Sequence, residues 1–281
     1  MTEPAGSRIL ENQYVAVKRC RHGIFAYNLN DLYISRSMDM YGEWCESELA
    51  LLFQVIKPGA VVVDVGANIG THTVALASHV TATGAVYAME PQRLTFQLLC
   101  ANIALNALTN VVCLNAAVGE TAGTTRIPTL DPLIENNFGG LPAHGHQSGE
   151  EVQVMRIDDL SLARCNLIKV DVEGMETSVL AGAKRTIREL RPVLFVENNS
   201  QERSSAVLTM LDELDYSCWW HVASYFNPNN FFGHPHRLFG EYLEANVLCF
   251  PKEAKVNAVG LWAVEGLDDT FVKAMERHRT R

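Results

Sequence analysis

The sequence predicts an α/β fold in which helices cover both faces of a mostly parallel sheet. From residue 60 onward, short runs of β-branched and apolar residues alternate with segments of helical periodicity. The first run, at 60–65, leads directly into a turn that contains Gly66 and Gly70, and then into a helical segment. Open α/β sheets present backbone groups to nucleotide-like ligands at strand–turn–helix junctions of this kind.

The composition fits one large α/β domain with additional segments. The chain has 281 residues, of which 48% are hydrophobic and 20% charged, and this supports a sizeable core. A formal net charge of −9 argues against a general nucleic-acid binder, because such proteins carry a basic face. Seven cysteines without C-x-x-C spacing predict neither a structural zinc site nor a disulfide framework. The sequence shows neither a secretory signal pattern nor a long apolar run, so we expect no membrane span and a cytoplasmic location.

The predicted elements follow in chain order. Residues 1–58 are expected to form an N-terminal cap, with short strands at 14–17, 24–27 and 31–35 and a helix over 46–56. Residues 59–252 form the main domain. Its strands are predicted at 60–65, 85–89, 111–117, 152–157, 167–171 and 192–196, with a late antiparallel pair at 216–222 and 245–250. Its helices are predicted over 70–80, 93–106, 174–190 and 202–214. The insertions 119–150 and 224–244 are long and irregular, which is typical of functional loops. The C-terminal tail, 253–281, is expected to carry a helix over 270–279.

The turn after the first strand has the pattern D-x-G-x-x-x-G. It differs from the G-x-G-x-x-G fingerprint of dinucleotide sites, so it predicts a cofactor without a pyrophosphate. We expect the two glycines to adopt φ values closed to other residues and to let the ligand approach the main chain. Asp64 can accept a hydrogen bond from a cofactor ammonium or from loop amides; the alternative is an ordinary strand–turn–helix corner. The candidate cofactor-binding residues of this turn are Asp64, Gly66, Ala67, Asn68, Gly70 and Thr71.

Acidic residues follow two further strands. Glu90 follows the strand at 85–89, where a carboxylate can hold ribose hydroxyls; the alternative is a solvated carboxylate at a strand end. Asp171 ends the strand at 167–171 and should point into the crevice at the carboxyl edge of the sheet. Glu173 and Glu176 fall in the first turn of the next helix, where negative charge is favoured in any case. Lys169 shares a strand face with Asp171; it can lose its charge when buried, but we expect it to pair with the carboxylates.

These segments together resemble the FkbM family of methyltransferases. The resemblance runs from about Tyr41 to Glu197, and Asp-Val-Glu-Gly-x-Glu is its most diagnostic element. The segments that carry it are V-D-V-G-A-N-I-G at 63–70, E-P at 90–91, N-A-A-V-G at 115–119, I-D-D-L at 157–160 and I-K-V-D-V-E-G-M-E at 168–176. It implies a class I methyltransferase (Rossmann-like) fold, with a seven-stranded mostly parallel sheet, and S-adenosylmethionine as the cofactor. It also implies methylation of a hydroxyl oxygen on a sugar, polyketide or other small natural product. Tyr41, Glu46 and Asn115 join the candidate cofactor site on this basis.

Methyl transfer to oxygen needs alignment of donor and acceptor, exclusion of water and removal of a proton. The catalytic candidates at the crevice are Asp171, Glu173 and Lys169. The insertions mix amides with aromatic rings, which suits a sugar surface and equally suits loops pinned by hydrophobic side chains. The candidate acceptor-binding residues are Asn137, Phe138, Glu197 and Asn230. Asp171, Glu173 and Glu197 offer an alternative magnesium site, although we expect no metal.

Two other functions compete with this interpretation. A nicotinamide-dependent oxidoreductase would normally have the third glycine of the dinucleotide fingerprint, which this turn lacks. The second is a non-catalytic cofactor-binding protein that keeps the same fold for binding or assembly; the intact Asp64, Gly66, Gly70, Glu90 and Asp171 argue against it. We expect a small-molecule or glycan acceptor and no nucleic-acid partner. The sequence makes no prediction about the oligomeric state.

Overall fold

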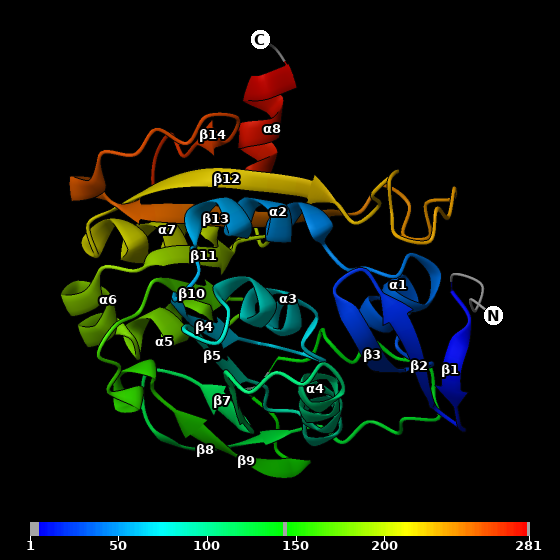
Figure 1. The fold of residues 1–281 in the computed structure, drawn as a ribbon. Coiled ribbons are helices and arrows are strands. Elements are labelled where there is room, and N and C mark those ends of the chain that lie inside the picture. The colour runs from blue at the N-terminus through cyan, green and yellow to red at the C-terminus, as the bar shows by residue number, and fades with distance from the viewer. Residues whose placement is uncertain (1–5, 143–144, 280–281) are drawn as a thin grey trace.

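The computed structural model describes residues 6–142 and 145–279. Within these residues the centre of the fold is an eight-stranded sheet in the order β14-β12-β13-β11-β10-β4-β5-β6 (Figure 1). Its strands are β4 (Val61–Val65), β5 (Ala85–Met89), β6 (Val111–Leu114), β10 (Leu167–Val170), β11 (Val193–Glu197), β12 (Tyr216–Ser224), β13 (Leu243–Pro251) and β14 (Trp262–Ala263). The neighbours from β6 to β11 are parallel, whereas β13 pairs antiparallel with both β11 and β12. This confirms the predicted α/β class; the two-residue β14 adds a strand at the edge.

Helices pack on both faces of this sheet. One face carries α2 (Glu46–Val55), α3 (Thr71–Val80) and α4 (Arg93–Leu105); the other carries α5 (Glu176–Ala181), α6 (Lys184–Leu190), α7 (Ser204–Glu213) and α8 (Phe271–Arg279). All five residues of β4 are buried, as expected for a strand covered on both sides. Because successive side chains point to opposite faces, Val63 and Val65 pack toward α5, and Val62 packs toward α2 and α3. Asp64 therefore lies on the α3 side.

Two small sheets flank the central one. The first contains β1 (Arg8–Glu11), β2 (Val15–Cys20) and β3 (Gly23–Asn28), all antiparallel, and lies beside α1 (Ile34–Met40) and α4 (Figure 1). Asn102 of α4 joins this sheet to the glycine turn: its side-chain amide exchanges two hydrogen bonds with the backbone of Ala26 and donates a third to the carbonyl oxygen of Ile69. The second small sheet contains β7 (Ala116–Val118), β9 (Glu150–Met155) and β8 (Gly123–Ile127). None of the helices in the described segments is long and apolar enough to cross a membrane.

Three predicted elements were wrong. The strand expected at 31–35 is the approach to α1, because the Asp31 carboxylate accepts a hydrogen bond from the backbone N–H of Ser35, 2.7 Å away, in the first turn of the helix. The single strand at 111–117 is divided at Asn115, where β6 leaves the central sheet and β7 joins another. The helix over 174–190 is interrupted at Gly182, between α5 and α6.

Part of the chain that was predicted to be irregular forms regular structure. The insertion expected at 119–150 contains all of β8 and the first residue of β9, and the strand expected at 152–157 lies at 150–155. A 3₁₀ turn, η1 (Ile157–Leu160), follows it, and a second, η2 (Lys252–Ala254), follows β13. The helix expected over 270–279 is present as α8.

Replacing Gly182 by alanine should destabilise the protein. A methyl group there would lie 2.0 Å from the carbonyl oxygen of Gly119, although φ is −75° and alanine is the better helix former. We expect this overpacking to lower the free energy of unfolding by about 1–3 kcal/mol in urea titrations. Gly123→Ala is the matched control, because a methyl group there meets nothing within 4 Å. Equal midpoints for the two variants would contradict the proposed close contact.

Candidate active site

Two clefts lie at the carboxyl ends of β4, β5, β10 and β11, and they share one wall. That wall contains Gly66, Asn68, Glu90, Gly139, Asp171 and Glu173. The inner cleft, of about 500 Å³, is otherwise lined mainly by apolar residues, namely Val65, Met89, Pro91, Ala116, Ala117, Val118, Leu141, Val172 and Met175. The outer cleft, of about 930 Å³ including its open mouth, adds carboxylates and aromatic rings.

Glu90 stands at the junction of the two clefts. Its side chain is buried, and its two carboxylate oxygens accept hydrogen bonds from the backbone N–H groups of Asn68 (3.0 Å) and Gln92 (2.8 Å). A carboxylate has about four lone-pair sites, so two remain for a ligand. Burial raises the pKa of Glu90 to about 7, and the two backbone donors only partly oppose this.

The wall depends on close packing between two loops. Gly66 has φ +77°, and a methyl group on it would lie 1.8 Å from the carbonyl oxygen of Asp171. Gly70 has φ +86°, and a methyl group there would lie 2.6 Å from Leu99. The positive φ values agree with the prediction, but the groups that come close are protein atoms. Position 66 therefore needs glycine chiefly because the loop that carries Asp171 packs against it and leaves no room for a side chain.

A buried ammonium connects the predicted acidic residues. Lys169 lies opposite Asp64 in the parallel register of β10 and β4, and its Nζ is 3.4 Å from Asp64 Oδ1 and 2.9 Å from Asp171 Oδ2. The other oxygen of Asp64 accepts a hydrogen bond from the Thr73 hydroxyl of α3 at 2.7 Å. Asp64 is fully buried under α3 and lies outside both clefts, whereas the Asp171 side chain is 43% exposed and lines both.

Lys169 is unsuited to act as a base. Burial by itself works against its charge, but the attraction of Asp171 and Asp64 outweighs burial and raises the pKa of the ammonium above its ordinary value. The expected pairing with carboxylates is thus the arrangement that the structure shows.

The outer cleft brings together carboxylates from four parts of the chain. Glu173 follows β10, and burial together with the charges of Asp171 and Glu176 raises its pKa. Glu197 ends β11, is 6% exposed, and accepts a hydrogen bond from the Asn199 amide at 2.6 Å. Glu48 of α2 and Glu244 of β13 complete this acidic lining. Sequence reasoning missed both, because neither belongs to a recognisable motif.

Aromatic side chains form another wall of the outer cleft, and sequence reasoning missed these too. Trp44 stacks on Tyr225 with ring centroids 4.8 Å apart, and Tyr33 stacks on Phe239 at 5.8 Å. Tyr242 meets Tyr33 edge to face. Trp44 and Tyr33 come from the N-terminal segment, while Tyr225, Phe239 and Tyr242 belong to the segment between β12 and β13 or directly adjoin it. Only tertiary packing brings these two segments together.

Several predicted site residues lie elsewhere. The Tyr41 hydroxyl donates to the carbonyl oxygen of His236 and accepts from the N–H of Leu238, so it anchors the 224–244 insertion. Glu46 contacts His22 and Arg21. Asn230 bonds within its own loop, to Asn227 and His234.

Four other predicted site residues support the glycine turn or its surroundings. Ala67 and Thr71 are buried, and the Asn115 amide donates hydrogen bonds to the carbonyl oxygens of Glu90 and Pro91. Phe138 is buried behind the shared wall. Asn137 does line the outer cleft.

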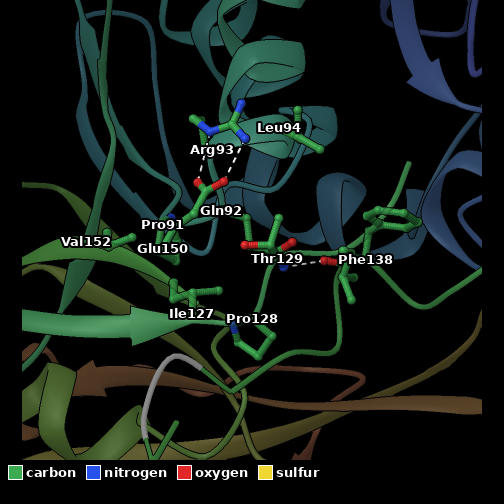
Figure 2. Close-up of a pocket in the computed structure, with 11 residues that line it drawn as sticks. Pro91, Gln92, Arg93, Leu94, Ile127, Pro128, Thr129, Phe138, Glu150 and Val152 are labelled. Carbon is green, nitrogen blue, oxygen red and sulfur yellow. Dashed lines mark hydrogen bonds and ion pairs between the residues drawn. The ribbon is translucent and has the colours of Figure 1, made fainter. Parts of the chain in front are cut away.

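Phe138 borders a separate shallow pocket (Figure 2). Two hydrogen bonds from the Arg93 guanidinium to Glu150, at 2.9 and 2.6 Å, link α4 to β9 beside it. The Gln92 amide donates to the carbonyl oxygen of Phe138. Because Gln92 also lines the inner cleft, this bond connects the 128–140 segment to that cleft.

The alternative metal set does not assemble. Among residues 6–142 and 145–279, no three His, Cys, Asp or Glu side chains are grouped closely enough to hold a metal ion. Asp171 is engaged by Lys169, and Glu197 by Asn199.

Lys169→Met should be strongly destabilising, because it leaves Asp64 buried without its cation. Removing one partner of a buried ion pair typically costs about 3–5 kcal/mol, and we expect a loss of this size in urea unfolding. Adding Asp64→Asn to the Lys169→Met variant should recover part of the loss. Lys57→Met, at an exposed position, is the control. Equal unfolding midpoints for Lys57→Met and Lys169→Met would rule out the buried ion pair.

Comparison with known proteins gives consistent matches. Residues 64–218 match the family described as the methyltransferase FkbM domain. The chain is 28% identical over 189 residues to the hexuronic acid methyltransferase AglP of Haloferax volcanii, covering 66% of this chain and 74% of that protein. It is 31% identical over 162 residues to the 31-O-demethyl-FK506 methyltransferase FkbM of Streptomyces tacrolimicus, covering 46% of this chain and 61% of that protein.

A solved structure is also similar. The crystal structure of methyltransferase FkbM from Methylobacillus flagellatus KT aligns with 72% of this chain and 50% of that chain, at 20% identity and a TM-score of 0.46. The match spans half of that solved chain and less than two thirds of the Streptomyces protein.

Proposed function

The chain belongs to the FkbM family of S-adenosylmethionine-dependent methyltransferases, and from this premise we propose that it methylates a hydroxyl oxygen of a sugar or other small natural product. The observation that carries the proposal is the wall shared by the two clefts. It places an apolar cleft on one side of Glu90 and Asp171 and an acidic, aromatic cleft on the other.

The residues of this wall fit the cofactor. The inner cleft offers apolar side chains for an adenine ring, and Glu90 has free lone pairs for two ribose hydroxyls. The exposed Asp171 carboxylate is available to an ammonium group, and Lys169 below holds it in place. When bound, S-adenosylmethionine supplies an electrophilic methyl group on a positively charged sulfur. The chain's own contribution is to orient this group toward the outer cleft.

The outer cleft suits a hydroxylated ring. Trp44 and Tyr225 offer flat apolar surface, and the amides of Asn137 and Asn199 offer hydrogen bonds around it. The relatives support the same class of acceptor, since one is named for hexuronic acid and another for a demethylated FK506. Tyr33 and Trp44 of the N-terminal segment line this cleft, which supports the prediction that this segment forms a cap over the acceptor.

Glu90→Ala should bind S-adenosylmethionine about 10- to 100-fold more weakly than the wild type, because it loses hydrogen bonds to a charged group worth about 1.5–3 kcal/mol. Isothermal titration calorimetry measures the affinity, and circular dichroism checks that the variant is folded. Glu189→Ala, at an exposed position of α6, is the matched control. Unchanged affinity in a folded Glu90→Ala variant would overturn the cofactor site.

Methyl transfer itself is tested with labelled S-adenosylmethionine and a panel of sugars, uronic acids and polyketide alcohols. We expect label in at least one product, with mass spectrometry locating the methyl group on oxygen. Transfer only to nitrogen or carbon, or to no member of the panel, would refute the proposed function.

A further inference from the structure

Three side chains that line the outer cleft but not the inner cleft form one group. Glu197 is the last residue of β11, and Glu244 lies near the start of β13. In the antiparallel register Glu197 lies opposite Asn246, so Glu244 is two residues away on the same face of the sheet. The two carboxyl groups are close enough for each to affect the pKa of the other. The Tyr225 hydroxyl donates to Glu244 Oε2 at 2.5 Å.

This group belongs to the acceptor side of the site. Glu197, Tyr225 and Glu244 line the outer cleft, whereas Glu90 and Asp171 line both clefts. The Trp44 ring stacks on Tyr225 and provides an apolar wall beside the carboxyl pair. A ring held against that wall would have its hydroxyl groups next to Glu244. Resting on the proposed function, we infer that Glu244, paired with Glu197 and Tyr225, binds the acceptor hydroxyl and takes its proton.

The charges around the pair give it the protonation behaviour of a base. Two adjacent carboxyl groups do not both ionise easily, so they share a proton. Burial and the neighbouring charges of Glu48 and Asp171 raise the pKa of Glu244 to about 8. Burial and Asp171 likewise raise the pKa of Glu197 above its ordinary value. The titratable groups that face the pair are Cys45, Glu48, Asp171, Glu173, Glu176 and Tyr225. A base with a pKa near the working pH is the most effective in proton transfer.

The other candidates are less suitable for this role. Lys169 keeps its proton, as shown above, and Asp171 is held by Lys169 beside the cofactor side of the wall. Glu244 lines the outer cleft and accepts a hydrogen bond from a neutral tyrosine hydroxyl, so it has lone pairs left for a ligand.

The step balances without a further reactant. The acceptor O–H bond breaks and its proton passes to the Glu244 carboxylate. The oxygen forms a bond to the methyl carbon, while the bond from that carbon to sulfur breaks and its electron pair stays on sulfur. The products are a methyl ether, the neutral thioether and a protonated carboxyl group, which then loses its proton to solvent.

The test compares Glu244→Gln with the wild type in single-turnover reactions, using labelled S-adenosylmethionine and the panel member methylated by the wild type. We expect the variant rate to fall roughly 10²- to 10⁴-fold, the usual contribution of general-base catalysis. S-adenosylmethionine affinity should be unchanged, because Glu244 does not line the inner cleft. Glu241→Gln is the matched control, since its side chain is 85% exposed and pairs with Arg237.

The pH dependence separates a proton acceptor from a residue that only shapes the cleft. Wild-type rates should rise as the pH passes through about 8, the pKa of Glu244, because the ionised form is active. Tyr225→Phe removes a donor that lowers the pKa of Glu244, so its profile should move to higher pH. Glu244→Gln should lose this rise.

The failures of the two proposals are distinguishable. If the wild type binds S-adenosylmethionine but methylates nothing in the panel, the proposed function fails and this inference fails with it. If the wild type methylates an acceptor and Glu244→Gln does so at the same rate with the same pH profile, only the inference is overturned. Loss of the rate together with loss of cofactor affinity would also overturn it.

Discussion

The buried ammonium of Lys169 is the interaction on which the site depends. It lies between Asp64 of β4 and Asp171 after β10, and these are adjacent strands at the centre of the parallel sheet. The same two segments meet again where Gly66 admits the carbonyl oxygen of Asp171. The ion pair with Lys169 holds the Asp171 carboxylate, and the close packing at Gly66 holds the backbone of the Asp171 loop. Together these two contacts hold the wall between the two clefts in place. A ligand on either side meets a surface that the sheet has already ordered.

Much of the inner side of the site could be predicted from the sequence. The residues concerned directly follow strands at the carboxyl edge, and chain order in a parallel sheet brings such positions together, as with Gly66, Glu90 and Asp171. Asp64 shows the limit of this reasoning. It lies within the motif, but the alternation of side chains along β4 turns it toward α3, where Thr73 and Lys169 bind it. Its motif position therefore indicates a supporting residue.

The outer side could not be predicted in the same way. Glu244 meets Glu197 only through the antiparallel register of β11 and β13, and this register is set by packing between segments far apart in the sequence. Trp44 and Tyr225 are separated by most of the chain and stack only after folding. Local signals also misled: the apolar run at 111–117 reads as one strand, but β6 and β7 belong to different sheets. Short-range patterns identify elements well and contacts between distant loops poorly.

The carboxylates of the shared wall, Glu90, Asp171 and Glu173, have a consequence for turnover under the proposed function. Buried carboxylates are costly unless a positive charge compensates them, and a sulfonium cofactor brings that charge to the shared wall. Methyl transfer removes it, because the sulfur becomes a neutral thioether. The attraction of the wall for the cofactor is then weaker in the product state than in the substrate state. The wall therefore holds the spent cofactor less tightly than it holds the donor, while Lys169 remains paired with Asp171.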